Sequence, residues 1–227
     1  YTKEKETISQ GEKGNPIPEK VGDPSPIKNV FYIIKENRTY DQVLGDMKEG
    51  NGDSSLVLFG EKVTPNEHKL ARDFVLLDNF YVDAEVSADG HNWSLGGYAN
   101  DYLEKNWVTS YGGRGGTYDA EGTREIANNK NGFIWNYCSR AGISYRTYGE
   151  FADDYKPNIP ILKGHYCPYY TSWDLTVSDT VRVAQWKRDV DALVSKNALP
   201  QLNTWRRMAD HAKGPAKERT ADSERVA

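Results

Sequence analysis

Residues 28–41 read KNVFYIIKENRTYD, and this stretch does most to decide the expected fold. Its first part, residues 30–34, is an unbroken run of apolar, β-forming residues, typical of a strand buried on both faces inside a parallel sheet. The run leads directly to Glu36 and Asn37. Ligands of open α/β sheets bind just beyond the carboxyl ends of the strands, so both side chains stand where a site is expected. Their oxygens suit a divalent cation. The alternative is that Glu36 and Asn37 belong to a solvated strand end that caps the next helix.

The rest of the chain alternates between strand and helix patterns, as parallel α/β folds do. Strands are expected at residues 74–81, 143–148 and 199–205, and helices at 39–46, 92–105, 131–141 and 182–195. Residues 1–27 are polar, rich in Gly and Pro and without periodicity, which indicates an extended linker or arm. The pattern predicts an α/β fold with a mainly parallel central sheet flanked by helices, in which residues 30–35 form an interior strand.

The segment from Glu36 to Gly45 follows this strand and has the form Glu-Asn-Arg-Thr-Tyr-Asp-x-x-x-Gly. It resembles the opening motif of the phosphoesterase family of bacterial phospholipases C and acid phosphatases, within the alkaline phosphatase superfamily. More narrowly, the chain looks like the phosphoesterase part of Bacteroidetes-type proteins in which such a domain follows a β-propeller. The resemblance covers about residues 28–211 and implies an alkaline-phosphatase-like fold. It also implies that Glu36 and Asn37 bind the catalytic metal.

A second motif, residues 77–93, reads LDNFYVDAEVSADGHNW. Its Ser87-x-x-Gly-His91 part is similar to the nucleophile segment of cofactor-independent phosphoglycerate mutases, so the resemblance implies that Ser87 is the nucleophile and a metal ligand. A helix start agrees with this role, because its unpaired N–H groups and dipole favour phosphate and an ionised oxygen. A plain helix N-cap is the alternative for Ser87, and Asp89 and Ser94 compete for the same local roles.

Two further side chains are candidates for substrate binding. His91 either contacts phosphate or metal, or anchors the turn that holds Ser87. Arg114 lies in the Gly-rich segment 111–117, YGGRGGT, which lacks the Lys and Ser/Thr of a nucleotide-binding loop and is expected to be a flexible loop. Arg114 is the residue of this loop suited to a substrate anion, because arginine binds phosphate bidentately.

The third motif of the family is only partly present. Relatives carry an Asn-Asp-His-Thr-like element after the strand expected at 199–205, whereas this chain reads RMADHA at residues 207–212. The resemblance makes Asp210 and His211 metal ligands, with a solvated tail as the alternative for His211. The family's downstream cluster of carboxylates and histidine does not follow. We therefore expect residues 28–211 to be the N-terminal part of an incomplete phosphoesterase domain, and residues 212–227 to be a poorly matching tail.

Composition limits the classes of partner. The 227 residues are enough for one sizeable domain, and the net charge of −4 gives no electrostatic reason to expect nucleic acid. No apolar run has transmembrane length. Cys138 and Cys167 allow one disulfide without establishing it. The compartment follows from the resemblance alone, which implies a location outside the cytoplasm, in the periplasm or at the cell surface.

The expected function is hydrolysis of a phosphate ester through Ser87, assisted by a divalent metal whose identity (Zn, Ca, Mg, Fe or Mn) stays open. Its expected partners are the phosphate-ester substrate and, through the resemblance, a β-propeller domain or components of an envelope complex. The alternative function is a non-catalytic, surface-exposed module of a bacterial envelope assembly.

Overall fold

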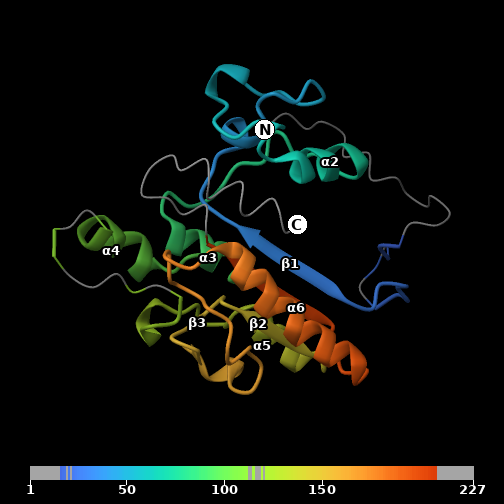
Figure 1. Cartoon of the computed structure of the whole chain (residues 1–227). Coiled ribbons are helices and arrows are strands. Elements are labelled where there is room, and N and C mark those ends of the chain that lie inside the picture. The colour runs from blue at the N-terminus through green and yellow to red at the C-terminus, as the bar shows by residue number, and fades with distance from the viewer. Residues whose placement is uncertain are drawn as a thin grey trace.

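The computed structural model describes residues 16–18, 20, 22–111, 114–115, 119 and 121–208. Within them the chain is α/β, with a three-stranded parallel sheet flanked by helices (Figure 1). The strands are β1 (Val30–Lys35), β2 (Tyr145–Tyr148), β5 (Leu202–Arg207) and the small antiparallel pair β3 (Ala152–Asp153) and β4 (Lys156–Pro157). The helices are α1 (Tyr40–Leu44), α2 (Pro65–Asp73), α3 (Ser87–Gly96), α4 (Asp101–Tyr111), α5 (Ile134–Arg140) and α6 (Asp179–Ser195), with 3-10 turns η1 (Ser54–Leu56), η2 (Glu125–Ala127) and η3 (Pro160–Leu162).

The strand order is β1-β5-β2, so the prediction of an interior strand at residues 30–35 is wrong. Within the described residues β1 pairs only with β5, and Val30 and Ile33 are 48% and 49% exposed. The central strand is β5, whose sequence LNTWRR is far more polar but whose six residues are all buried. An apolar run indicates that a segment favours the strand conformation. Whether that strand is central or at the edge of a sheet depends on which side chains find buried partners.

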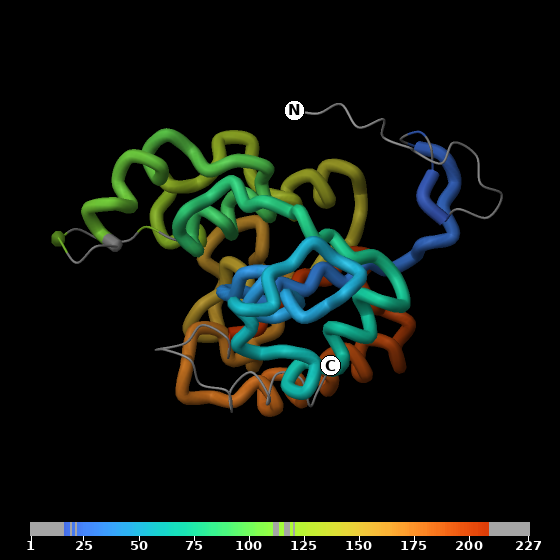
Figure 2. Tube along the Cα trace, turned by 90° about the horizontal axis from the view of Figure 1, so that it is seen from above, coloured from blue at the N-terminus to red at the C-terminus, as the bar shows by residue number. Residues whose placement is uncertain are grey.

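Two helices cover opposite faces of the sheet. Because side chains alternate along a strand, Leu202 and Trp205 of β5 point to opposite sides. Leu202 packs in one core cluster with Trp135 of α5, and Trp205 packs in a second cluster with Val183 of α6. In Figure 2 the blue β1 runs between green-to-yellow segments and the orange-to-red α6. Burial of these aromatic side chains is the main term that holds the layers together.

Two expected elements differ from the structure. Residues 74–81 form no strand, and their Phe80 and Tyr81 side chains are 73% and 80% exposed. The helix expected at 92–105 is two helices, because α3 ends at Gly97, whose φ of +76° belongs to the left-handed region. The Gly97 N–H donates to the Trp93 carbonyl and closes the helix end there.

Several sequence predictions concern residues at the limits of the structure. Asp210, His211 and the tail 212–227 lie outside the described residues, as does most of the expected linker at 1–27.

Cys138 and Cys167 are both free and buried, so no disulfide joins them. Among the helices of the described residues, none is both long enough and apolar enough to span a bilayer.

Candidate active site

The carboxyl ends of the three parallel strands bring ionisable side chains together. Glu36 follows β1, Glu150 lies two residues beyond β2, and Arg206 is the next-to-last residue of β5. Parallel strands that point the same way end at one edge of the sheet, which is where α/β proteins place their sites. We call the joined set the Glu–His–Arg cluster, and its members are Glu36, His91, Glu121, Glu150 and Arg206.

Ser87 stands at the edge of this cluster. Its Oγ donates a hydrogen bond of 2.5 Å to Oε2 of Glu36. Val86 occupies the N-cap position of α3 and Ser87 is the first helical residue, so the N-cap alternative for Ser87 is wrong. The positive end of the α3 dipole therefore lies at the serine hydroxyl. The structure brings together the two residues, 51 positions apart, that the sequence placed in one site.

His91 lies between two carboxylates. Its Nε2 is 2.9 Å from Oε2 of Glu36, its Nδ1 is 3.1 Å from Oε2 of Glu150, and its side chain is 3% exposed. Burial alone would lower the pKa of His91, but the negative charge and hydrogen bond of Glu150, together with the charge of Glu121, raise it to about 10. At neutral pH the ring is an imidazolium that donates through both nitrogens, and it holds Glu36 against Ser87.

Arg206 is the second cation of the cluster and is fully buried. Its Nη2 lies 3.3 Å from Oε1 of Glu36, its Nη1 donates to Glu121, and its Nε lies 3.8 Å from Glu150. Burial by itself would raise the pKa of Glu36, but the hydrogen bond and charge of His91, with the charge of Arg206, hold that pKa well below its usual range. Glu36 is therefore ionised across the physiological pH range.

The cluster holds three carboxylates and only two cations. Burial raises the pKa of Glu121, against the opposing charges of Arg206 and His91. Ionising Glu121 as well would leave an uncompensated negative charge in a buried place, which is costly. Burial therefore favours the protonated form of Glu121, which reduces the excess of negative charge in the cluster.

The backbone is strained at three points around this cluster. Glu121 itself has φ of 48°, and Asn37 (87°) and Phe151 (50°) directly follow Glu36 and Glu150. Non-glycine residues with such φ values cost of order 1–3 kcal/mol each, and they concentrate at functional sites. Three of the six non-glycine residues with positive φ in the described part of the chain therefore lie at or beside these carboxylates.

Other sequence candidates are not joined to the cluster. Asn37 is exposed, and within the described residues no hydrogen bond links its side chain to Glu36 or Ser87. Arg114 is exposed beyond the end of α4, where its backbone N–H donates to the Thr109 carbonyl. No ion pair connects its guanidinium with the cluster among the residues that the structure describes. Asp210 and His211 cannot be placed, because they fall outside that part of the chain.

Sequence reasoning missed Glu121, Glu150 and Arg206. The rule that found Glu36, a polar residue just after a strand, also finds Glu150 once it is applied to the strand expected at 143–148. Arg206 also directly follows the strand expected at 199–205, but a charged residue there is equally typical of a solvated strand end. Glu121 lies in a loop with no neighbouring motif, and only the fold brings it to Arg206.

The described residues do not by themselves fit a divalent metal. None of their His, Cys, Asp and Glu side chains form a group of three or more able to hold one. Both oxygens of Glu36 already accept hydrogen bonds, from Ser87 and His91 on one side and Arg206 on the other. Two of these donors are cations, which oppose the approach of a metal ion.

Comparisons with protein-family models, with curated proteins and with solved structures give no match for this chain. The function of the site is therefore inferred from its geometry and from the sequence motifs that contain Glu36 and Ser87.

One buried carboxylate beside the site gives a stability prediction. Asp89, in the first turn of α3, is 1% exposed, and neither of its oxygens has a hydrogen-bond partner. Burial, with a smaller contribution from the charge of Glu104, raises the pKa of Asp89 to about 6. Folding therefore favours the protonated acid, and the cost of ionising it is absent below about pH 4 and complete above about pH 6.

We expect Asp89→Asn to raise the free energy of unfolding by about 1–3 kcal/mol at pH 7.5, because it removes an unpaired buried charge. The gain should shrink to near zero at pH 4, where the wild-type carboxyl is already protonated. Urea unfolding at pH 4, 5, 6 and 7.5 measures this difference. Asp101→Asn on exposed α4 is the matched control, and an equal gain in both variants, or a gain independent of pH, contradicts the prediction.

Proposed function

We propose that this chain carries a phosphoesterase site in which Ser87 is the nucleophile, on an alkaline-phosphatase-like α/β fold. One observation carries the proposal: the Ser87 hydroxyl, at the start of α3, is hydrogen-bonded to the Glu36 carboxylate at the carboxyl end of a parallel strand. A nucleophile, a carboxylate that takes its proton and a helix start that attracts anions therefore meet at one point.

The first step follows from this arrangement. The Ser87 oxygen attacks the phosphorus of the ester, its proton passes to Glu36, and the bond from phosphorus to the leaving alcohol oxygen breaks. The low pKa of Glu36 makes it a weak base. A weak base suffices because transition states of phosphoryl transfer are loose, and positioning contributes more than proton abstraction. The alcohol leaves as its anion or takes a proton from water.

The second step restores the enzyme. Water attacks the phosphoserine at residue 87, phosphate leaves, and the serine oxygen takes back the proton that Glu36 holds. His91 and Arg206 act as positioning residues throughout, because each binds Glu36 rather than Ser87. They hold the Glu36 carboxyl group at the serine, and their charges favour its return to the ionised form at the end of the cycle.

A divalent metal enters this proposal only through ligands beyond the described residues, since the cluster itself does not fit one. None of the steps above uses a metal. The expected location outside the cytoplasm rests on the same resemblance as the metal, and both stay proposals.

A second candidate function has its own support. Residues 74–82 carry large apolar side chains that are mostly exposed, among them Phe74 at 76% and Val82 at 77%. The β1 edge adds Val30 and Ile33 at about half exposure. Groups of exposed apolar side chains of this kind are typical of contact with another polypeptide, which favours a non-catalytic module of a larger assembly.

A substrate panel separates the two functions. The purified chain is incubated with p-nitrophenyl phosphate, bis-p-nitrophenyl phosphate and p-nitrophenyl acetate, in chelator and then with Zn²⁺, Mg²⁺, Mn²⁺ or Ca²⁺ added. The proposal predicts hydrolysis of a phosphate ester above the uncatalysed rate and no acceleration of acetate hydrolysis. Turnover that appears only with a metal places the missing ligands outside the described residues. No turnover with any ester under any of these conditions favours the non-catalytic module.

A further inference from the structure

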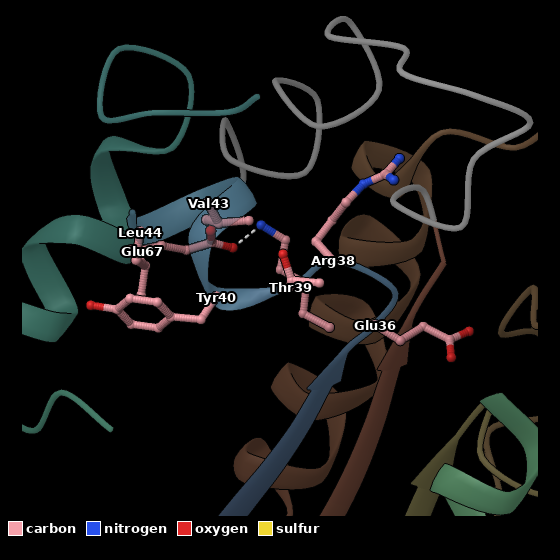
Figure 3. Close-up of a pocket in the computed structure, with 8 residues that line it drawn as sticks. Glu36, Arg38, Thr39, Tyr40, Val43, Leu44 and Glu67 are labelled. Atoms are coloured by element: carbon pink, nitrogen blue, oxygen red, sulfur yellow. Dashed lines mark ion pairs between the residues drawn. The ribbon is translucent and has the colours of Figure 1, made fainter. Parts of the chain in front are cut away.

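A cavity of about 250 Å³ opens at the carboxyl end of β1, beside Glu36, the carboxylate that binds Ser87. Glu36, Arg38, Thr39 and Tyr40 are among the residues that line it (Figure 3). In the close-up the Arg38 and Glu36 side chains both extend away from Tyr40, which points to the opposite side. A larger hollow of about 510 Å³ at Arg124–Ile126 contains none of the residues of the Glu–His–Arg cluster.

Arg38 lines this cavity, and one of its N–H groups has no hydrogen-bond acceptor. Its Nε is buried and has no hydrogen-bond partner, and no carboxylate of the described residues forms an ion pair with it. Its guanidinium carbon lies 5.1 Å from the centre of the Phe59 ring, and Phe59 is fully buried. A guanidinium at this distance from a ring is attracted to its face, which helps to hold Arg38 in place without using its N–H groups.

The other buried or half-buried arginines of the described residues are used differently. Arg146 pairs with Asp189, Arg182 and Arg207 with Asp179, and Arg206 with the glutamates of the cluster. Each of these guanidinium groups has a carboxylate partner within the protein. Arg38 is half-buried yet forms no ion pair with a carboxylate of the described residues, so its charge is available to a ligand.

We propose that Arg38 binds the anionic oxygens of the substrate phosphate in this cavity. A buried N–H without an acceptor costs free energy until an acceptor arrives, and a planar guanidinium matches two oxygens of a phosphate at once. Ser87 does not itself line the cavity, but Glu36 does, and the Glu36 carboxylate accepts the hydrogen bond of Ser87. Glu36 therefore links the proposed anion site to the proposed nucleophile. The identification of the ligand as substrate rests on the proposed function. Arg38 then takes the substrate-binding role that the sequence assigned to Arg114.

Binding of inorganic phosphate tests this assignment without requiring turnover. Titration calorimetry compares the wild type, Arg38→Gln and Arg38→Lys, with Arg140→Gln as the matched control. Arg140 also stacks on an aromatic ring, that of Tyr137, but it lies on α5 away from the cavity. Loss of a charge-assisted hydrogen-bonding group should weaken phosphate binding by about 10-fold or more in Arg38→Gln. Arg38→Lys should restore part of the affinity, while Arg140→Gln binds phosphate as the wild type does.

The outcomes separate this inference from the proposed function. If Arg38→Gln binds phosphate as tightly as the wild type, or if the wild type binds none, the role of Arg38 is overturned even where the ester is hydrolysed. If phosphate binds through Arg38 but no ester is hydrolysed, the anion site stands and the phosphoesterase proposal fails. Thermal unfolding of every variant shows whether a loss of binding reflects a loss of fold, and Arg38→Lys, which keeps the charge, decides the case where Arg38→Gln unfolds.

Discussion

Replacing Ser87 by alanine is expected to lower phosphate-ester turnover by about 10³-fold or more, because it removes the attacking oxygen. The fold should survive, since alanine is the best helix former and Ser87 is only half-buried at the first position of α3. Steady-state hydrolysis of p-nitrophenyl phosphate, under the conditions where the wild type is active, measures the loss. Circular dichroism of the variant checks that α3 and the rest of the fold remain.

Ser94→Ala is the matched control for this experiment. Ser94 lies on the same helix but is exposed and outside the cluster, so its replacement should leave turnover within about 2-fold. A Ser87→Ala variant with near-wild-type turnover contradicts the assignment of the nucleophile. A loss of turnover in Ser94→Ala alone shifts the assignment to that serine.

The second large effect concerns stability. Arg206→Met is expected to lower the free energy of unfolding by about 3–5 kcal/mol, because it leaves buried glutamates without their shared cation. Arg206 contacts Glu36, Glu121 and Glu150, and its side chain is 2% exposed. Methionine fills a similar volume, so the loss reports the charge rather than a cavity.

Chemical unfolding at pH 7.5 measures this effect, with Arg140→Met as the control at an exposed position. The control should change the free energy of unfolding by no more than about 0.5 kcal/mol. Adding Glu121→Gln to Arg206→Met should recover part of the loss, because it removes one of the ionisable groups that Arg206 contacts and that its loss leaves buried without a cation. A loss below about 1 kcal/mol in Arg206→Met contradicts the account of the cluster as a set of mutually compensating charges.

The sequence predicted the part of the site that follows from local rules. A polar residue directly after an apolar strand and a serine at a helix start are both visible in the chain, and the structure brings Glu36 and Ser87 within hydrogen-bond distance. His91 follows from Ser87, because residues four apart on a helix share a face. Its two carboxylate partners, by contrast, come from separate strand ends.

The remaining members of the cluster depend on long-range contacts that no local pattern encodes. Arg206 looks like a solvated residue near a strand end, but it is buried because Glu36, 170 positions away, and Glu121 reach it. The same physics explains the misplaced strand. The apolar segment of β1 lies at the edge of the sheet, and polar β5 is central because its charges are paired there.

The exposed segment 74–82 shows a second reason why a strand predicted from the sequence can be wrong. Its composition predicts a strand, yet in the described residues it has no ladder partner. A strand forms only when a neighbouring strand satisfies its backbone groups. Local propensity therefore identified a segment capable of pairing without identifying a partner for it.

The central claim is that Ser87 attacks phosphorus, and trapping the covalent intermediate tests it most directly. The chain is mixed with p-nitrophenyl phosphate, quenched in acid within the first turnovers, and examined by intact mass spectrometry and peptide mapping. The account predicts a mass increase of one phosphoryl group located at residue 87, absent from Ser87→Ala and present in Ser94→Ala. Ester hydrolysis with no phosphorylated protein, or with the phosphoryl group on another residue, would contradict it.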